Sequence, residues 1–208
     1  MRGECFRIHL VRHGQSQWNL ERRVQGQVMH VPLTPLGERQ AKDAAVLLAD
    51  SGVRAVFTSD QLRAVQTAEH IAARLGATLV LDPDLRERSL GRYEGLRSDD
   101  AWRVVGTAWE EPGWRPPGGE SLLDVRIRLR RFIDGLRRRA CGSPVAVVTH
   151  GETAMAALAL LSGRAPGQLP PAALANGEVV TVSCPRSPAA GRPATQQVQR
   201  TQQVQRTS

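Results

Sequence analysis

Two histidines, His13 and His150, each follow a short apolar run and precede a glycine. The runs, residues 6–11 and 144–149, are rich in the side chains typical of buried strands. Glycine lets a chain turn sharply where a strand ends, so both imidazoles are predicted to lie at strand carboxyl ends. In open α/β sheets the connecting loops leave a ligand-binding crevice along that edge. The structural alternative for either histidine is a hydrogen-bonded side chain in an ordinary strand-end turn.

Two arginines are placed to share that edge. Arg12 directly precedes His13, and Arg63 follows a third predicted strand, residues 54–58, near the start of the next helix. The planar guanidinium matches the oxygens of a phosphoryl group, and a helix N-terminus also attracts anions. The two side chains therefore predict a pocket for a phosphoryl group, with a carboxylate ligand as the weaker alternative.

The histidines then acquire distinct chemical roles. Between two guanidiniums the protonated form of a histidine is disfavoured, so His13 is predicted to be neutral and nucleophilic at neutral pH. His150 would donate a hydrogen bond to charge that develops on the transferring group. Because these four side chains supply the positive charge that metal ions give in other phosphoryl-transfer sites, we expect no metal and no cofactor. Cys5, Cys141 and Cys184 are odd in number and widely spaced, which predicts neither disulfides nor a zinc site.

The elements that position these residues alternate between strand and helix, which predicts an α/β fold. The predicted strands span residues 6–11, 54–58, 77–81, 144–149 and 179–184, and the predicted helices span 34–50, 59–75, a segment that begins at 121, and 152–161. Thr34 and Pro35 form a typical helix start, since threonine caps and proline suits the first helical position. In that helix Leu36, Ala44 and Leu47 are expected on the inward face.

Residues 84–121 contain too many glycines and prolines to be a simple connection. We interpret residues 88 to about 120 as a loop-rich lid insertion with one short helix near 98–105. Four aromatic residues fall in it, and they either pin the segment to the core or present ring-stacking surface to the substrate: Tyr93, Trp102, Trp109 and Trp114. The second interpretation predicts a preference for phosphomonoesters with apolar or ring-containing leaving groups.

The formal net charge is +8, and four arginines after residue 185 account for half of it. The arginines of the helix that begins at 121 are expected to face water, and they are Arg126, Arg128, Arg130, Arg131 and Arg137 to Arg139. Because no aromatics interleave them, we expect no nucleic-acid partner. No 18-residue apolar run and no leader are evident, so a cytoplasmic protein without membrane contact is expected.

A composition change marks the C-terminal tail. The hexapeptide TQQVQR occurs at 195–200 and again at 201–206, in a stretch rich in Pro, Ala, Gln, Arg and Thr. Such a segment is too polar to bury a core, so residues 186–208 are predicted to be a disordered, basic tail after one domain at 1–185.

Several motifs together resemble the histidine phosphatase superfamily, the phosphoglycerate-mutase-like fold, in its phosphatase branch. They are RHGQSQWN at 12–19, RRVQG at 22–26, PLTPLGERQA at 32–41, SDQLRAVQTA at 59–68, LRERSLGRYEG at 85–95, PPGGES at 116–121 and VVTHGE at 147–152. The resemblance implies a three-layer α/β/α sandwich around a mostly parallel sheet. It also implies a histidine acid-type phosphatase, a metal-independent phosphomonoester hydrolase that acts on a small phosphorylated metabolite.

By this resemblance His13 is the nucleophile that forms a phosphohistidine. Arg12, Arg63 and His150, with Gly151, bind the phosphoryl oxygens. Asn19 contributes its amide, and Gln25 and Gly26 match positions on the substrate side.

Glu87 matches the proton donor of the family. The sequence alone does not distinguish it from Glu94 or Glu120. Glu152, where many relatives have glycine or asparagine, is interpreted as tolerated variation. His30 departs from the aspartate that is common there, which argues against a substrate contact at that position.

Two other classes of function remain open. A mutase must hold a second anionic group and exclude water, and mutase relatives do so with basic residues in an insertion that residues 92–118 resemble poorly. A non-catalytic phosphate-binding or scaffold protein would have lost the nucleophile, an arginine or the acid, and all are present. A homodimer is left open.

Overall fold

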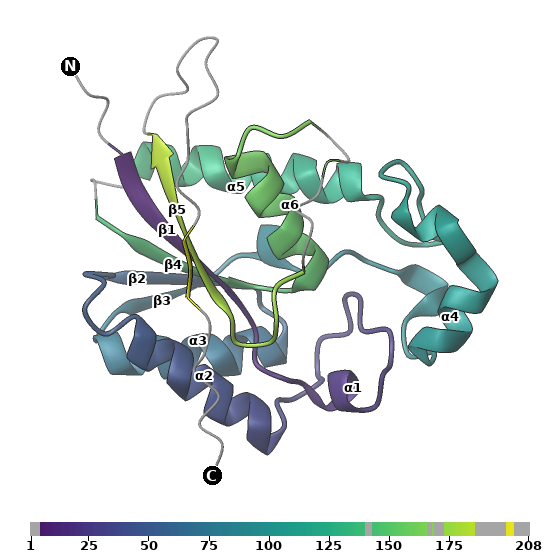
Figure 1. The fold of residues 1–208 in the computed structure, drawn as a ribbon, viewed down its shortest axis with the longest axis horizontal. Coiled ribbons are helices and arrows are strands. Elements are labelled where there is room, and N and C mark those ends of the chain that lie inside the picture. The colour runs from purple at the N-terminus through teal and green to yellow at the C-terminus, as the bar shows by residue number, and fades with distance from the viewer. Residues whose placement is uncertain (1–4, 140–142, 166–167, 169–172, 186–198, 202–208) are drawn as a thin grey trace.

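A six-stranded sheet in the order β3-β2-β4-β1-β5-β6 forms the centre of the computed structural model (Figure 1). The structure describes residues 5–139, 143–165, 168, 173–185 and 199–201. The strands are β1 (Cys5–Arg12), β2 (Ala55–Thr58), β3 (Thr78–Leu81), β4 (Val145–Thr149), β5 (Val179–Pro185) and β6 (Gln199–Thr201). The β3-β2-β4-β1 pairs are parallel, and β5 is antiparallel to β1 and to β6. The predicted α/β sandwich around a mostly parallel sheet is confirmed.

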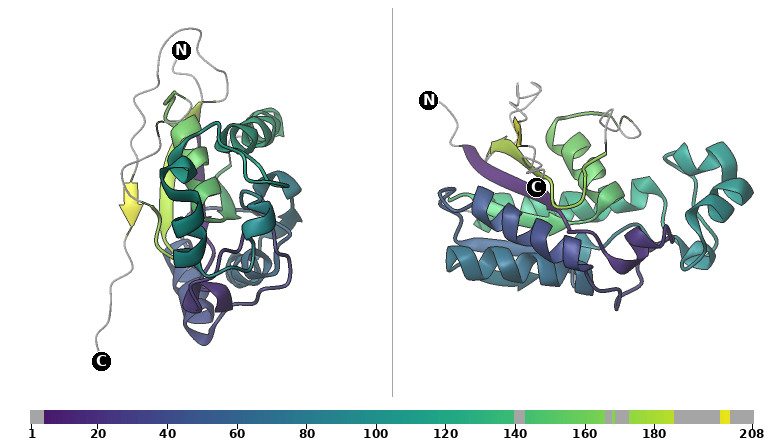
Figure 2. Two further views of the ribbon diagram at one scale, coloured as in Figure 1. Left: turned by 90° about the vertical axis from the view of Figure 1, so that its right-hand side faces the viewer. Right: turned by 60° about the horizontal axis from the view of Figure 1, so that its bottom comes forward.

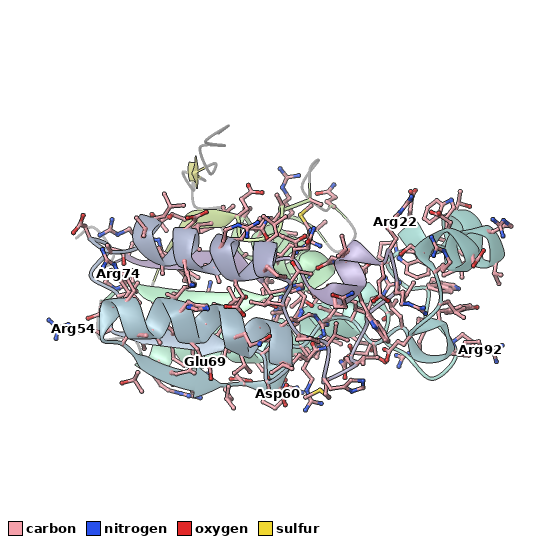
Figure 3. All side chains as sticks on the ribbon, turned by 90° about the horizontal axis from the view of Figure 1, so that it is seen from below. Arg22, Arg54, Asp60, Glu69, Arg74 and Arg92 are labelled. Carbon is pink, nitrogen blue, oxygen red and sulfur yellow. The ribbon has the colours of Figure 1, made fainter. Side chains whose placement is uncertain are left out.

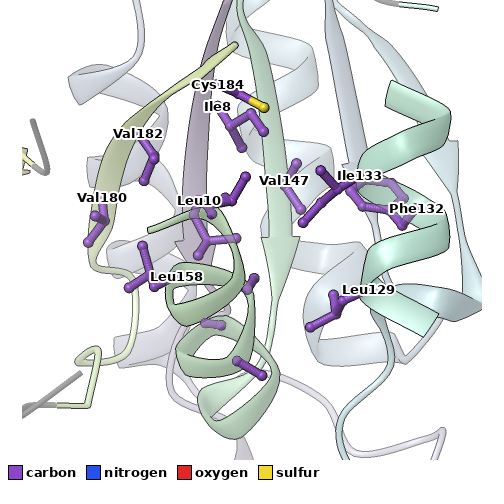
Figure 4. Close-up of a cluster of buried hydrophobic side chains, with 14 of the residues drawn as sticks. Ile8, Leu10, Leu129, Phe132, Ile133, Val147, Leu158, Val180, Val182 and Cys184 are labelled. Atoms are coloured by element: carbon purple, nitrogen blue, oxygen red, sulfur yellow. The ribbon is translucent and has the colours of Figure 1, made fainter. Parts of the chain in front are cut away.

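One face of the sheet packs against α5 (Leu122–Arg139) and α6 (Gly151–Leu161). Successive strand side chains point to opposite faces, so Ile8 and Leu10 of β1 and Val147 of β4 share this side. Leu129 of α5 and Leu158 of α6 close over them, and each is at most 2% exposed. Figure 4 shows this cluster between the two helices and the strands. This packing fixes the strand ends from which the histidines extend.

The other face packs against α2 (Pro35–Leu47) and α3 (Leu62–Leu75), mostly through alanines. The predicted inward face of α2 is wrong in part, because Leu36 and Leu47 are 40% and 42% exposed. The buried face is turned by one residue and contains Gly37, Ala41, Ala44 and Ala45. A Cβ on Gly37 would lie 2.1 Å from the Gln15 carbonyl oxygen, so a close backbone contact sets the rotation of the helix.

The ends of the helices follow local capping chemistry. The Thr34 hydroxyl accepts a hydrogen bond from Gly37 N at 3.1 Å, as expected of an N-cap. Helix α3 begins at Leu62, three residues after the predicted start at 59, with Gln61 at the N-cap position but without a side-chain capping hydrogen bond, and it ends at Gly76 in the left-handed region. Arg63 is therefore in the first turn of α3.

The segment from Asp84 to Ser121 stands apart from the sheet at one end of the molecule (Figures 1 and 2). It contains the short 3-10 helices η2 (Gly91–Tyr93) and η3 (Gly106–Glu110) and the predicted α4 (Ser98–Val105), after η1 (Pro83–Leu85). Helix α1 (Gln17–Leu20) lies at the same end of the molecule, across from α4 (Figure 1). The rings of Tyr93, Trp109 and Trp114 pack together with centroids 5.9 to 6.3 Å apart. Three of the four aromatics thus stabilise the segment itself.

The arginines are distributed around the molecule rather than gathered at one place. Figure 3 labels Arg54 and Arg74 at one end and Arg22 and Arg92 at the other. The prediction that all arginines of α5 face water is wrong for Arg128, which is 7% exposed. Its guanidinium donates hydrogen bonds to oxygens of three residues of the loop-rich segment, Asp84, Glu87 and Glu120. The helical period of the sequence does not reveal contacts with such a distant segment.

The predicted tail lies largely outside the described residues. Its one described part, β6, pairs in antiparallel register with β5 between Val179 and Thr181, which departs from the expectation of a tail without regular structure. Backbone pairing at a sheet edge does not depend on side chains, so a polar sequence can take part in it. Among the described residues no helix is long and apolar enough to cross a membrane.

Candidate active site

The two histidines meet where β1 and β4 end side by side. The register pairs Arg12 with Thr149, so the next residues, His13 and His150, leave the sheet together. Their ring centroids are 5.1 Å apart, with an angle of 61° between the ring planes. The structure thus brings the two predicted imidazoles into contact at the carboxyl edge of the sheet.

The ring of His13 is fixed by its own turn. Its Nδ1 lies 2.6 Å from the Gly14 carbonyl oxygen. Because a carbonyl only accepts, Nδ1 carries the proton and Nε2 keeps its lone pair. Burial, with the charges of Arg63 and Arg12, holds the pKa of His13 well below its usual value. A neutral imidazole with an unprotonated Nε2 is the form required of a nucleophile.

Glycine is required at position 14 for a geometric reason. A Cβ there would lie 2.3 Å from the Gly37 carbonyl oxygen at the start of α2. The same backbone is held on its other side, where Gly14 N donates to the Thr67 hydroxyl at 3.1 Å. The turn that carries His13 is therefore clamped between α2 and α3.

The guanidinium of Arg63 is fully buried. Its Nη1 donates to the Val28 carbonyl at 2.8 Å, and its Nη2 donates to the Gly26 carbonyl at 3.0 Å. Burial lowers the pKa of Arg63 to about 10, which leaves it cationic at neutral pH. Gly26 adopts a φ of +46°, and the Glu94 carboxylate occupies the place of a Cβ, so this position also requires glycine.

Arg12 reaches the site from the last residue of β1. Its Nη1 donates to the Leu174 carbonyl at 2.6 Å. Burial is the main cause that lowers its pKa, and Glu87 and Glu178 oppose that shift. A Cβ on Gly151 would lie 3.6 Å from the Arg12 guanidinium carbon, so the first residue of α6 packs directly on this cation.

His150 is buried behind His13 at the N-cap of α6. Neither ring nitrogen has a hydrogen-bond partner within the described part of the chain. Burial, with the charge of Arg63, holds the pKa of His150 well below its usual value. An unpartnered buried nitrogen is costly, so a polar ligand at this place would be stabilised.

Glu87 is aimed at the site by the first turn of α6. Its Oε1 accepts hydrogen bonds from the Thr153 backbone N at 3.0 Å and from the Thr153 hydroxyl at 2.9 Å, and its Oε2 accepts from Glu152 N at 3.2 Å. By contrast, Glu94 accepts from the backbone of Gln27 and Leu90, and Glu120 pairs with Arg128. Geometry therefore separates Glu87 from the two acids that the sequence could not exclude.

Asn19 and Gln25 are held by Ser16. The Ser16 backbone N and hydroxyl both donate to Asn19 Oδ1 at 3.0 Å. Asn19 N donates in return to the Ser16 hydroxyl oxygen at 3.2 Å, which completes the capping box of α1. The Ser16 hydroxyl also lies 2.7 Å from Gln25 Oε1. Asn19 therefore caps a helix in addition to any contact that its amide nitrogen makes with a ligand.

A cavity of about 540 Å³ opens over this group. Of the nine site residues predicted from the sequence, seven line this cavity, and Asn19 and His150 do not. The remaining lining is mostly apolar and comes partly from the segment that carries α4: Val24, Leu90, Ser98, Trp102, Trp109, Glu152, Met155 and Ala173. Trp102 is 47% exposed, so this ring lies at a cavity wall and not in the core. Among the described residues no cluster of three or more His, Cys, Asp or Glu is arranged to hold a metal ion.

Sequence reasoning missed the residues that hold Glu87 from behind. Thr153 could be suspected from its place three residues after His150, in the first turn of a helix with free N–H groups. Arg128, whose Nη2 donates to the Glu87 carbonyl at 3.1 Å, gives no local signal.

The profile of the histidine phosphatase superfamily (branch 1) matches residues 8–190. The chain therefore belongs to this superfamily, which confirms the predicted family. Among curated relatives, a protein of Photorhabdus laumondii subsp. laumondii named "Probable phosphoglycerate mutase GpmB" is 38% identical over 155 residues, which is 70% of each chain.

Two solved structures resemble the chain closely. A mycobacterial glucosyl-3-phosphoglycerate phosphatase superposes with a TM-score of 0.79 at 30% identity, covering 85% of this chain and 90% of that one. The alpha-ribazole phosphatase from Shigella flexneri gives a TM-score of 0.76 at 25% identity, covering 85% and 90%. The names of the relatives thus divide between phosphatase and mutase.

Proposed function

We propose that the protein is a phosphomonoester hydrolase that works without a metal ion, through a phosphohistidine on His13. The observation that carries the proposal is the free Nε2 of a neutral His13 in a cavity that Arg12 and Arg63 also line. Neutral imidazole attacks, and the guanidiniums stabilise the phosphoryl oxygens as charge develops on them. The substrate is a small phosphorylated metabolite.

In the first step His13 Nε2 attacks phosphorus and a bond forms between them. The bond from phosphorus to the ester oxygen breaks, and its electron pair leaves with that oxygen. Protonated Glu87 gives the leaving oxygen its proton. The phosphoryl oxygens are held by the guanidiniums of Arg12 and Arg63 and by the ring N–H of His150. The Gly14 carbonyl keeps the proton of His13 on Nδ1.

In the second step water attacks the phosphohistidine. Glu87, now a carboxylate, takes a proton from the water as the bond from phosphorus to Nε2 breaks and its electron pair returns to His13. Inorganic phosphate leaves, and Glu87 is again protonated. The donors from Thr153 and Glu152 hold the carboxylate in one place for both transfers.

The mutase is the alternative that the names of curated relatives favour. A mutase for phosphoglycerate needs cations for the carboxylate or second phosphate of its substrate. Among the described residues that line the cavity, Arg12 and Arg63 are the only arginines and no lysine is present. Both lie beside His13, where the transferring phosphoryl group binds. The hydrolase is therefore the better match to this cavity, and its walls suit an apolar or ring-containing leaving group.

The test follows the fate of the phosphoryl group. The protein is incubated with phenyl phosphate or 3-phosphoglycerate, the latter with and without 2,3-bisphosphoglycerate as primer, and inorganic phosphate and 2-phosphoglycerate are measured. We expect phosphate release, with a higher kcat/KM for phenyl phosphate. Faster transfer to 2-phosphoglycerate than release of phosphate would establish the mutase instead. Absence of turnover with every phosphomonoester would favour a binding or scaffold role.

A further inference from the structure

Glu152 lines the cavity two residues after His150, and the proposed reaction uses only its backbone N–H. Its side chain retains 31% of its exposure, whereas that of its ion-pair partner, Arg88, is fully buried. The distance between Arg88 Nε and Glu152 Oε2 is 3.2 Å. Glu152 is therefore the member of the pair that lines the cavity, although its Oε2 atom is itself buried.

Arg88 is held where it cannot serve as a cation for the substrate. Its guanidinium carbon lies 5.7 Å from the ring centroids of both Trp109 and Trp114, in cation-π contact with each. None of its guanidinium nitrogens makes a hydrogen bond within the described part of the chain. A buried guanidinium needs a compensating charge, and Glu152 supplies it.

Trp109 fixes the carboxylate from the other side. Its indole Nε1 donates to Glu152 Oε1 at 3.1 Å, and the ring also lines the cavity. Burial, with the charge of Glu87, raises the pKa of Glu152, and the Arg88 guanidinium acts in the opposite direction. A further anion beside this carboxylate would be unfavourable, whereas a hydrogen-bond donor would stabilise it.

The side chains that line the cavity carry charges of both signs. Arg12 and Arg63 are the cations of its described lining, and Glu152 lines it together with the apolar side chains of Leu90 and Met155. A leaving group that extends into this cavity from a phosphorus bound at His13 is therefore exposed to the charge of Glu152.

We propose that Glu152 is a specificity-determining residue, held by Arg88 and Trp109, that selects leaving groups bearing a hydroxyl or ammonium donor and rejects those bearing a carboxylate. The inference rests on the proposed hydrolase and names the substrate class of the same site. Rejection by a like charge is an established means of discriminating between substrates of similar size.

Three phosphomonoesters of similar size test the proposal: phosphoethanolamine with an ammonium group, sn-glycerol 3-phosphate with a hydroxyl group and 3-phosphoglycerate with a carboxylate. We expect kcat/KM of the wild type to be lowest for 3-phosphoglycerate. In Glu152→Gln the ratio of kcat/KM for 3-phosphoglycerate to that for glycerol 3-phosphate should rise on the order of tenfold or more, because at an effective dielectric constant of about 20 two like charges roughly 12 Å apart already repel each other by the equivalent of a factor of ten. The substitution removes the repulsion and also leaves the charge of Arg88 uncompensated.

Glu110→Gln is the matched control, because it changes the net charge equally at an exposed position one residue after Trp109. Its substrate ratio should equal that of the wild type. A ratio of two substrates in one preparation is independent of the folded fraction, so partial unfolding of the Glu152 variant does not obscure the result. Trp109→Phe, which removes the indole donor and keeps a ring, should shift the ratio in the same direction by a smaller factor.

The same measurements separate a wrong specificity role of Glu152 from a wrong assignment of the reaction. If all three substrates are hydrolysed, His13→Ala abolishes hydrolysis, and Glu152→Gln leaves the ratio unchanged, the specificity role is wrong while the reaction stands. If neither these three substrates nor phenyl phosphate is hydrolysed by the wild type, the proposed function itself is wrong. If phenyl phosphate alone is hydrolysed, the specificity role is wrong while the reaction stands. A ratio that falls in Glu152→Gln would also contradict the proposal.

Discussion

Arg128→Met removes the one buried cation that joins α5 to the loop carrying Glu87 within the described residues. In the wild type its guanidinium donates to the Asp84 carbonyl at 2.7 Å and the Glu87 carbonyl at 3.1 Å. It also donates from Nε to Glu120 Oε1 and from Nη2 to Glu120 Oε2, each at 3.2 Å. Methionine has a similar aliphatic length, so the variant deletes the donors and the charge more than the packing.

The expected loss follows from what remains behind. Removal of one partner of a buried ion pair costs about 3–5 kcal/mol, because the other charge stays buried without compensation. Glu120 is 24% exposed and keeps hydrogen bonds from Ser89 N and Gln27 Nε2, so the loss should lie at or just below the lower end of that range. We expect a loss of about 2–3 kcal/mol in the free energy of unfolding, or roughly 4–12 °C in Tm for a domain of this size.

Thermal and urea unfolding of the purified protein measure this loss, and kcat reports on the placement of Glu87. Activity should fall by roughly tenfold or less, because the Glu87 carboxylate keeps its donors from Thr153 and Glu152. Arg130→Met is the matched control, since it lies on the same helix outside this network and should change stability by no more than about 0.5 kcal/mol. Equal stability of the Arg128 and Arg130 variants would refute the structural role of Arg128.

Three further predictions concern the arginines, acid stability and metal ions. Arg12→Ala and Arg63→Ala should each lower kcat/KM about 10²–10³-fold, as expected for one charge-stabilising contact, and near-wild-type rates for either variant would contradict the two-arginine pocket. Burial, with the charge of Arg7, lowers the pKa of His9 to about 4 in the folded protein. The unfolded chain therefore binds one more proton at His9 than the folded chain between about pH 6.5 and about pH 4, and the free energy of unfolding should decrease as the pH is lowered through this range. His9→Gln should lose less stability than the wild type between pH 7 and pH 5 in urea titrations, whereas an equal loss would mean that His9 does not contribute. A chelator should leave the rate unchanged and vanadate should inhibit as a pentacoordinate phosphate mimic; loss of activity in chelator that magnesium restores would show a metal requirement.

The residues that extend from strand ends are predictable because short-range rules place them. A buried apolar run followed by His-Gly predicts both the strand and its end, so His13 and His150 needed no tertiary information. Arg63 follows a third strand by the same reasoning. Their convergence is a consequence of the parallel order of β1, β4 and β2, which the alternating pattern of elements already indicated.

The residues that the sequence misplaced are set by contacts between distant segments. Arg128 adjoins the buried stripe of α5, and a helical period cannot show that carbonyl and carboxylate oxygens from 84–120 accept its hydrogen bonds. The rotation of α2 depends on a backbone contact between Gly37 and Gln15. Glu87 needed the family resemblance, because Glu94 and Glu120 carry the same chemistry and differ only in their partners.

A phosphoryl group on His13 is the intermediate that separates this reaction from direct attack of water on the substrate phosphorus. The protein is mixed with a ³²P-labelled phosphomonoester, quenched in alkali within the first turnovers, and analysed by gel and by peptide mass spectrometry. We expect an acid-labile, alkali-stable label on the peptide that contains His13 and no label in His13→Ala. In Glu87→Gln the label should accumulate with a leaving group such as 4-nitrophenolate, which needs no proton, because attack by water would then lack its base. Turnover by His13→Ala at the wild-type rate, or a label that maps to another residue, would contradict the phosphohistidine mechanism.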